Sequence, residues 1–87
     1  MAADPASPQW HVYVVRCVDA TLYTGVAKNL QARIAQHNAG RGAKYTNSRR
    51  PVTLVYQEAA ADRSAAQSRE HEIRHLAPQA KRALISG

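Results

Sequence analysis

An arginine and a histidine stand among the apolar positions of a predicted helix that follows the stretch "TLYTGVAKN". With about 100° per residue, His37 lies inside the apolar stripe formed by Leu30 and Ile34, and Arg33 lies at its edge. The planar donor fork of arginine matches a phosphate group, and histidine titrates close to neutral pH. Taken singly, the two residues are more simply a core histidine and an arginine whose stem covers apolar surface, with a catalytic role as the alternative.

A carboxylate lies on the inner side of a second predicted helix. On a wheel centred on Ile73, Glu70 falls on the shoulder of the apolar stripe and Glu72 falls well outside it. An inward carboxylate is costly unless it is paired or bound to a metal, so Glu70 is the distinctive acid of this helix and Glu72 a surface residue. The motif "HEIRH" matches a zinc-protease pattern, but its histidines point away from the core and no third ligand follows, which indicates coincidence.

Two tyrosines belong to a predicted hairpin, and the length of its loop decides whether they share a face. A three-residue loop, 18–20, places Tyr13 opposite Gly25 and Tyr23 opposite Val15, on one face of the sheet. A two-residue turn would place the tyrosines on opposite faces. The first arrangement predicts one cleft open to solvent, whereas the alternative role is that of strand formers in the core.

Periodicity predicts the elements that position these side chains. Asn29 is a suitable N-cap for the first helix, and either Asp62 or Ser64 for the second. The order β-β-α-β-α-α indicates an α+β domain with a small, three-stranded, mostly antiparallel sheet flanked by helices. The predicted elements are strands at 10–18, 21–26 and 52–59, helices at 30–38 and from about 62 to 77, a polar loop at 41–51 and a short terminal helix from 79.

Composition favours a single domain that binds a polyanion. The chain has 87 residues and a formal net charge of +6, which favours nucleic acid, and it contains no long apolar run that predicts a membrane span. The single cysteine, Cys17, fits a cytoplasmic location. Residues 1–9 are predicted to be a flexible leader and 10–87 the domain, and the oligomeric state is open. The basic residues predicted to contact backbone phosphates, with a solvated loop as the alternative, are Lys28, Arg41, Lys44, Arg49 and Arg50.

The motifs together resemble the GIY-YIG nuclease domain. "YTG" at 23–25 stands for Y-I-G, "HVY" at 11–13 keeps the tyrosine of G-I-Y, and "NLQARIAQH" with a later inward glutamate completes the pattern. The similarity extends from about residue 10 to 76. It is strongest to the small single-domain bacterial subgroup and includes the nuclease domains of eukaryotic branched-DNA endonucleases and of the UvrC excision nuclease. Many members also carry an asparagine in the C-terminal part, and this chain has none after Asn47.

The resemblance implies metal-dependent hydrolysis of phosphodiester bonds, on DNA rather than RNA, with structured or branched substrates. It implies Glu70 as the ligand of Mg²⁺ or Mn²⁺, and either Tyr23 or His37 as the base for the attacking water. A non-catalytic nucleic-acid-binding module with the same fold is the main alternative, and an adaptor for an acidic protein is a weaker one. The residues that the resemblance places in the catalytic site are Tyr13, Tyr23, Arg33, His37 and Glu70.

Overall fold

The computed structural model describes residues 10–86, and its elements follow the predicted order. The predicted leader, 1–9, lies outside the described residues. No helix within 10–86 is long and apolar enough to cross a membrane. The elements are β1 (Trp10–Arg16), β2 (Leu22–Ala27), α1 (Leu30–Asn38), α2 (Lys44–Asn47), β3 (Thr53–Ala60), α3 (Arg63–Arg74) and α4 (Pro78–Ser86).

The three strands form one antiparallel sheet in the order β2-β1-β3. Tyr13 pairs with Gly25 and Tyr23 pairs with Val15, as a three-residue loop predicts. The loop is closed by a bond from the Cys17 amide to the Thr21 carbonyl at 2.8 Å. Both tyrosines therefore lie on the same face of the sheet.

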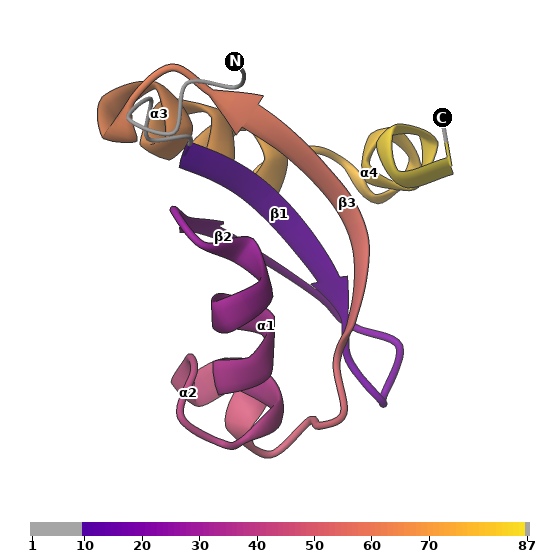
Figure 1. Cartoon of the computed structure of the whole chain (residues 1–87). Coiled ribbons are helices and arrows are strands. Elements are labelled where there is room, and N and C mark those ends of the chain that lie inside the picture. The colour runs from indigo at the N-terminus through magenta and orange to yellow at the C-terminus, as the bar shows by residue number, and fades with distance from the viewer. Residues whose placement is uncertain (1–9, 87) are drawn as a thin grey trace.

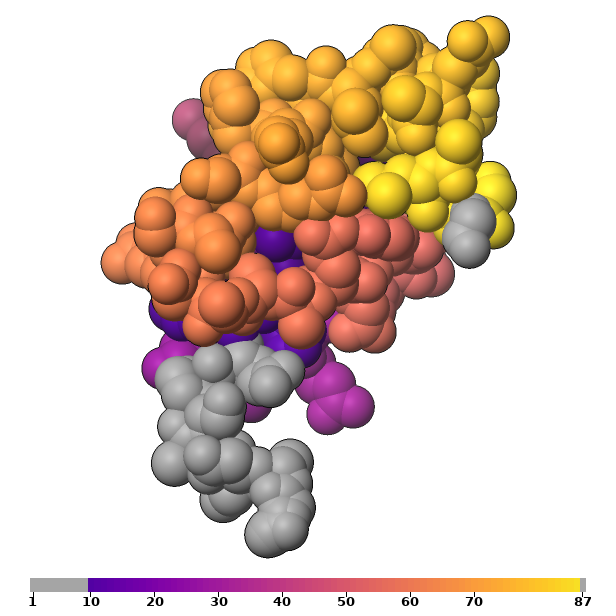
Figure 2. Space-filling model, turned by 90° about the horizontal axis from the view of Figure 1, so that it is seen from above, coloured from indigo at the N-terminus to yellow at the C-terminus, as the bar shows by residue number. Residues whose placement is uncertain are grey.

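Each face of the sheet has its own hydrophobic cluster, with helices on opposite sides (Figure 1). Odd-numbered β1 residues such as Tyr13 and Val15 pack on the side of α1. Even-numbered residues such as Val12 and Val14 pack against Ile73 of α3 and apolar residues of α4. Figure 2 shows the outer surface that α3, α4 and β3 form together. The alternation of apolar residues on both faces explains why helices cover the sheet from both sides.

A β-bulge interrupts the ladder between β1 and β3. Val14 pairs with Tyr56, but Val15 pairs with Leu54, so that Val55 is the extra residue. Consecutive residues Val55 and Tyr56 consequently both pack in the cluster beneath α3 and α4, whereas Leu54 packs on the α1 side.

Side-chain caps fix the starts of the two longer helices. The Asn29 side chain accepts a bond from the Ala32 amide at 3.0 Å, and Asp62 accepts one from Ala65 at 2.8 Å. Asp62 is thus the cap of α3, and the alternative of Ser64 is wrong. The helix ends at Arg74 rather than near residue 77, because the chain turns before Pro78 begins α4.

The prediction of an uninterrupted loop at 41–51 is wrong. The single helical turn α2 lies within it, without a side-chain cap. Its stability comes from tertiary contacts, since Thr46 is completely buried and hydrogen-bonds to His37. Four residues with no apolar periodicity give no sequence signal for such a turn.

Candidate functional site

A chain of hydrogen bonds runs through the core on the α1 side of the sheet. The Tyr13 hydroxyl lies 2.7 Å from Nε2 of His37, and Nδ1 of His37 lies 2.7 Å from Oγ1 of Thr46. Thr46 Oγ1 in turn lies 3.0 Å from the carbonyl oxygen of Ala43. All three side chains are 0% exposed. β1, α1 and α2 therefore each contribute one side chain to a single buried network.

The network fixes the tautomer of His37. The Thr46 hydroxyl has one proton, which it donates to the carbonyl of Ala43, so it accepts a bond from Nδ1–H of His37. Nε2 is then unprotonated and accepts the hydrogen bond of the Tyr13 hydroxyl. The amide of Ala43 is 3.5 Å from Nδ1, too long to compete with this arrangement. His37 is a neutral imidazole with both nitrogens engaged.

Arg33 supplies the positive charge closest to this network. Burial raises the pKa of Tyr13 above its ordinary value, while hydrogen bonding to Arg33 and its charge oppose the rise. Burial lowers the pKa of His37, and the charge of Arg33 lowers it further. The half-buried guanidinium of Arg33 also donates to Gln36 at 3.1 Å. Both shifts keep Tyr13 and His37 neutral at pH 7.

Two glycines allow the network to pack tightly. A methyl group at Gly25 would overlap the ring and hydroxyl of Tyr13, and one at Gly42 would overlap the ring and backbone of His37. The glycine of "YTG" is thus required by the ring of Tyr13, its cross-strand partner. The space that a side chain at position 25 would occupy is filled by Tyr13.

Stacked side chains cover the network. Tyr23 contacts His37 edge-on with ring centroids 5.4 Å apart, and it stacks on Tyr45 of α2 at 6.0 Å. The guanidinium of Arg49 lies 4.0 Å from the ring centre of Tyr45 and pairs with Asp19 at 3.1 Å. The prediction that the whole site is open to solvent is therefore wrong for Tyr13 and His37, because Tyr23 and α2 cover them.

A hollow of about 340 Å³ lies along the free edge of β2. Leu22 and Tyr23 belong to opposite faces of the sheet but both line it, so it crosses the sheet edge from the α1 side to the α3 side. Tyr23 forms no hydrogen bond through its hydroxyl to another residue in 10–86. The lining residues are Leu22, Tyr23, Thr24, Tyr45, Arg74 and Lys81.

Glu70 is linked to this hollow through its ion pair with Arg74. Its carboxylate is 3.3 Å from Nε of Arg74, one helical turn later in α3, and only 16% of the Glu70 side chain is exposed. The Glu72 side chain is 66% exposed and pairs with Arg69, in agreement with the wheel. Glu70 belongs to α3, which packs on the opposite face of the sheet from Tyr13 and His37, and Arg74 joins it to the hollow lined by Tyr23.

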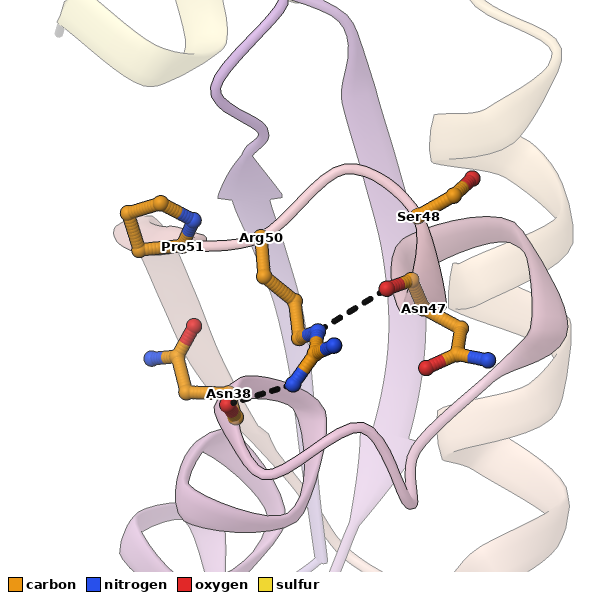
Figure 3. A pocket seen from close by; sticks show the side chains of 5 residues that line it. All are labelled: Asn38, Asn47, Ser48, Arg50 and Pro51. Atoms are coloured by element: carbon orange, nitrogen blue, oxygen red, sulfur yellow. Dashed lines mark hydrogen bonds between the residues drawn. The ribbon is translucent and has the colours of Figure 1, made fainter.

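The predicted phosphate-binding residues fall into two groups. Arg50 donates to the Asn47 carbonyl at 2.8 Å and to the Asn38 carbonyl at 3.3 Å, bridging α1 and α2 in a polar pocket (Figure 3). Arg49 is similarly engaged by Tyr45 and Asp19. Lys28, Arg41 and Lys44 are exposed. Lys28 also lies over the ring of Trp10, with Nζ 5.7 Å from its centroid, so three of the five predicted cations have structural partners, and Arg41 and Lys44 are the two for which the described residues show none.

The histidines of "HEIRH" remain outside any metal cluster. His71 and His75 are exposed, with ring centroids 4.2 Å apart. Within residues 10–86 no group of three or more His, Cys, Asp or Glu side chains is arranged to hold a metal ion. The exposure of both histidines agrees with their predicted placement on the helical wheel, away from the core.

Four residues at the site were not singled out from the sequence. Thr46 and Tyr45 belong to the unpredicted turn α2, and Arg74 and Lys81 line the hollow from α3 and α4. The spacing of Glu70 and Arg74 by four residues is a recognisable helix-pair signal. Thr46 and Tyr45 offer no such signal, since their position depends on the fold of the loop.

Comparison with known proteins places this architecture in a nuclease-type family. The family model described as the GIY-YIG catalytic domain matches residues 9–81, and the chain belongs to the GIY-YIG family. It is 53% identical over 79 residues to a UPF0213 protein of Desulfotalea psychrophila, covering 90% of this chain and 72% of that protein. A UPF0213 protein of Natronomonas pharaonis is 49% identical over 86 residues, covering 99% and 95%.

A solved structure has the same fold. The solution NMR structure of a UPF0213 protein from Bacillus halodurans is 37% identical, covers 90% of this chain and 83% of that chain, and gives a TM-score of 0.58. The family resemblance deduced from the tyrosine, glycine and arginine–histidine motifs is thereby confirmed.

Proposed function

We propose that this protein is a metal-dependent endonuclease that hydrolyses phosphodiester bonds in DNA with branched or otherwise structured features. The observation that carries the proposal is the meeting, along the free edge of β2, of Tyr23 with the Glu70–Arg74 pair. Behind Tyr23 lies the buried pair of Tyr13 and His37. A phenol and an arginine that line one hollow, with a carboxylate paired to that arginine, suit proton transfer and phosphate binding.

Tyr23 is the group that we assign to the attacking water. It lines the hollow, whereas His37 is fully buried and both its ring nitrogens are engaged. His37 instead positions Tyr13 and supports the ring of Tyr23 from behind. Arg74 lines the same hollow and contributes positive charge that favours a phosphate anion, while the charge of Arg33 acts on the buried pair of Tyr13 and His37.

Glu70 is the residue that would hold the metal. Mg²⁺ and Mn²⁺ are hard cations, and Mg²⁺ commonly takes one or two carboxylates together with waters and substrate phosphate oxygens. A single, mostly buried carboxylate beside an open hollow fits that mode of binding better than an all-protein cage. When bound, such a cation polarises the scissile phosphate and stabilises the leaving oxygen.

Basic surface residues support a nucleic-acid substrate. The exposed Arg41 and Lys44 lie in the connection that carries α2, and Tyr45 of that turn lines the hollow. Cations at such positions bind backbone phosphates with little dependence on sequence. The preference for branched DNA rests on the resemblance to branched-DNA endonucleases. The buried, unpaired Cys17 suits a cytoplasmic enzyme.

A nicking assay tests the proposal. Labelled flap, fork, single-stranded and linear duplex DNA would be incubated with the protein and Mg²⁺ or Mn²⁺. Glu70→Gln should lower cleavage by roughly 10²-fold or more, because several kcal/mol of metal-assisted stabilisation is lost. Tyr23→Phe should also abolish most activity. Glu72→Gln is the matched control, since that exposed carboxylate belongs to the same helix.

The outcomes separate catalysis from binding. Loss of cleavage in Glu72→Gln with activity retained in Glu70→Gln would contradict the assignment of the metal ligand. Salt-sensitive DNA binding without metal-dependent cleavage by the wild-type protein would instead identify a non-catalytic nucleic-acid-binding module.

A further inference from the structure

The proposed metal ligand already has a cationic partner within the protein. Nε of Arg74 lies 3.3 Å from Oε2 of Glu70, and these residues are four apart in α3, with the acid nearer the N-terminus. This order is the favourable one for a helical ion pair. Because the Glu70 side chain is only 16% exposed, its charge would otherwise be left poorly solvated.

Arg74 also lines the hollow, where it is placed to contact a second anion. Its side chain is 58% exposed and lines the hollow, together with Tyr23, Tyr45 and Lys81. Nζ of Lys81 lies 3.4 Å from the backbone carbonyl of Arg74, so a second positive charge stands beside the same hollow. Two cations and two aromatic rings around a groove of this size suit one phosphate group of a nucleic-acid strand.

We propose that Arg74 is an internal counter-ion of Glu70 that a substrate phosphate draws away, so that nucleic acid and the divalent cation bind cooperatively. The inference rests on the proposed function, because it assumes that Glu70 holds the metal. In the free protein, Arg74 competes with the divalent cation for the carboxylate. A phosphate in the hollow offers Arg74 an alternative anionic partner and leaves Glu70 available.

The energetics suit a reversible exchange. A partly exposed pair of this kind contributes little net free energy, so displacing Arg74 should change metal affinity by only about two- to fivefold. Binding linkage is reciprocal: if DNA raises the affinity for the cation, the cation raises the affinity for DNA by the same factor. The protein would then bind its metal weakly until substrate is present.

The first experiment measures Mn²⁺ binding to the DNA-free protein by the electron paramagnetic resonance signal of free Mn²⁺. Arg74→Ala should bind Mn²⁺ about two- to fivefold more tightly than the wild type, and Glu70→Gln should lose that site. Lys81→Ala is the matched control, because it removes one positive charge from the same hollow without touching the ion pair. Circular dichroism would verify that every variant is folded.

The second experiment measures coupling by fluorescence anisotropy of a labelled branched duplex, with and without Ca²⁺ as a hard cation. Wild-type protein should bind DNA more tightly when Ca²⁺ is present. In Arg74→Ala, overall DNA affinity should fall, and the ratio of affinities between the two conditions should be smaller than in the wild type. In Glu70→Gln this ratio should be close to one, because the metal ligand is gone.

Each outcome has one meaning. Unchanged Mn²⁺ affinity in Arg74→Ala, or an equal gain in Lys81→Ala, would overturn the counter-ion role while leaving the endonuclease proposal intact. Mn²⁺ binding that survives in Glu70→Gln would show that the metal is held elsewhere, and both the metal assignment and this inference would fall.

Discussion

At the scale of single residues, His37 couples protonation to folding. Burial holds its pKa below the ordinary value of 6.5, and the charge of Arg33 acts in the same direction. In the unfolded chain histidine titrates near ~6.5, so the unfolded state binds more protons as the pH falls below that value. Stability from the buried neutral ring is complete above ~6.5 and is lost as the pH falls toward the folded pKa.

The expected result is a melting temperature that falls between pH 7.5 and 5. In His37→Gln the decline should be smaller, because the amide does not titrate. At pH 7.5 this variant should be less stable by about 1–3 kcal/mol, since Tyr13 and Thr46 lose a well-placed partner. Thermal denaturation followed by circular dichroism measures both effects. His71→Gln, at an exposed position, should keep the wild-type slope, and a steep slope in His37→Gln would contradict the assignment.

Gly25 gives a second test at this scale. Gly25→Ala should destabilise the protein by about 1–3 kcal/mol, because the added methyl group would overlap the ring of Tyr13. The denaturant midpoint of unfolding measures the effect, and the imidazole NMR signals of His37 would report displacement of its Tyr13 partner. A midpoint equal to that of the wild type would show that the tyrosine ring is not fixed against this glycine.

At the scale of elements, the structure identifies Asp62 rather than Ser64 as the N-cap of α3. Asp62→Ala should lower the free energy of unfolding by about 1 kcal/mol, because the Ala65 amide loses its acceptor. Ser64→Ala should have almost no effect, since Ser64 lies within the first turn and is exposed. Chemical denaturation of both variants measures the difference. Equal losses would mean that the helix begins differently.

The helices and strands were largely predictable from the sequence, but the turn that covers the buried network was not. Periodicity and caps were enough to predict the sheet and the first helix, whereas the shared face of Tyr13 and Tyr23 depended on the length of the hairpin loop, which the sequence left open between two and three residues. Helical wheels predicted the burial of His37 and the contrast between Glu70 and Glu72. The turn α2 is held by the buried hydroxyl of Thr46 through a long-range interaction that local pattern does not encode. The covering of the network could therefore not be predicted.

At the scale of the whole molecule, the net charge of +6 should make nucleic-acid affinity strongly dependent on salt. Replacing Arg41 and Lys44 together by Ala should reduce the slope of log affinity against log salt by roughly 0.9 for each duplex phosphate that is no longer neutralised. Fluorescence anisotropy at several salt concentrations measures the slope. The fold should be unaffected, because both side chains are exposed.

Arg49→Ala provides the comparison. This arginine is held by Asp19 and Tyr45, so its removal should lower the melting temperature as well as any affinity for DNA. If the double variant of Arg41 and Lys44 leaves the salt slope unchanged while both proteins remain folded, the phosphates must be bound elsewhere, for example at Lys28, Arg74 or Lys81.

The bulge at Val55 also determines where this chain can change in length. The extra residue places Leu54 on the α1 side of the sheet and both Val55 and Tyr56 on the other side. The alternation of side chains between the two faces is therefore reversed across the bulge. If Val55 instead took part in a regular ladder without the bulge, the residues before it would exchange faces, and buried Val52 would turn to the other side of the sheet. Insertions in the exposed part of 41–51 meet no such constraint. A change of length is therefore tolerated in the exposed part of 41–51, whereas between Val52 and Tyr56 it is tolerated only where the bulge takes it up.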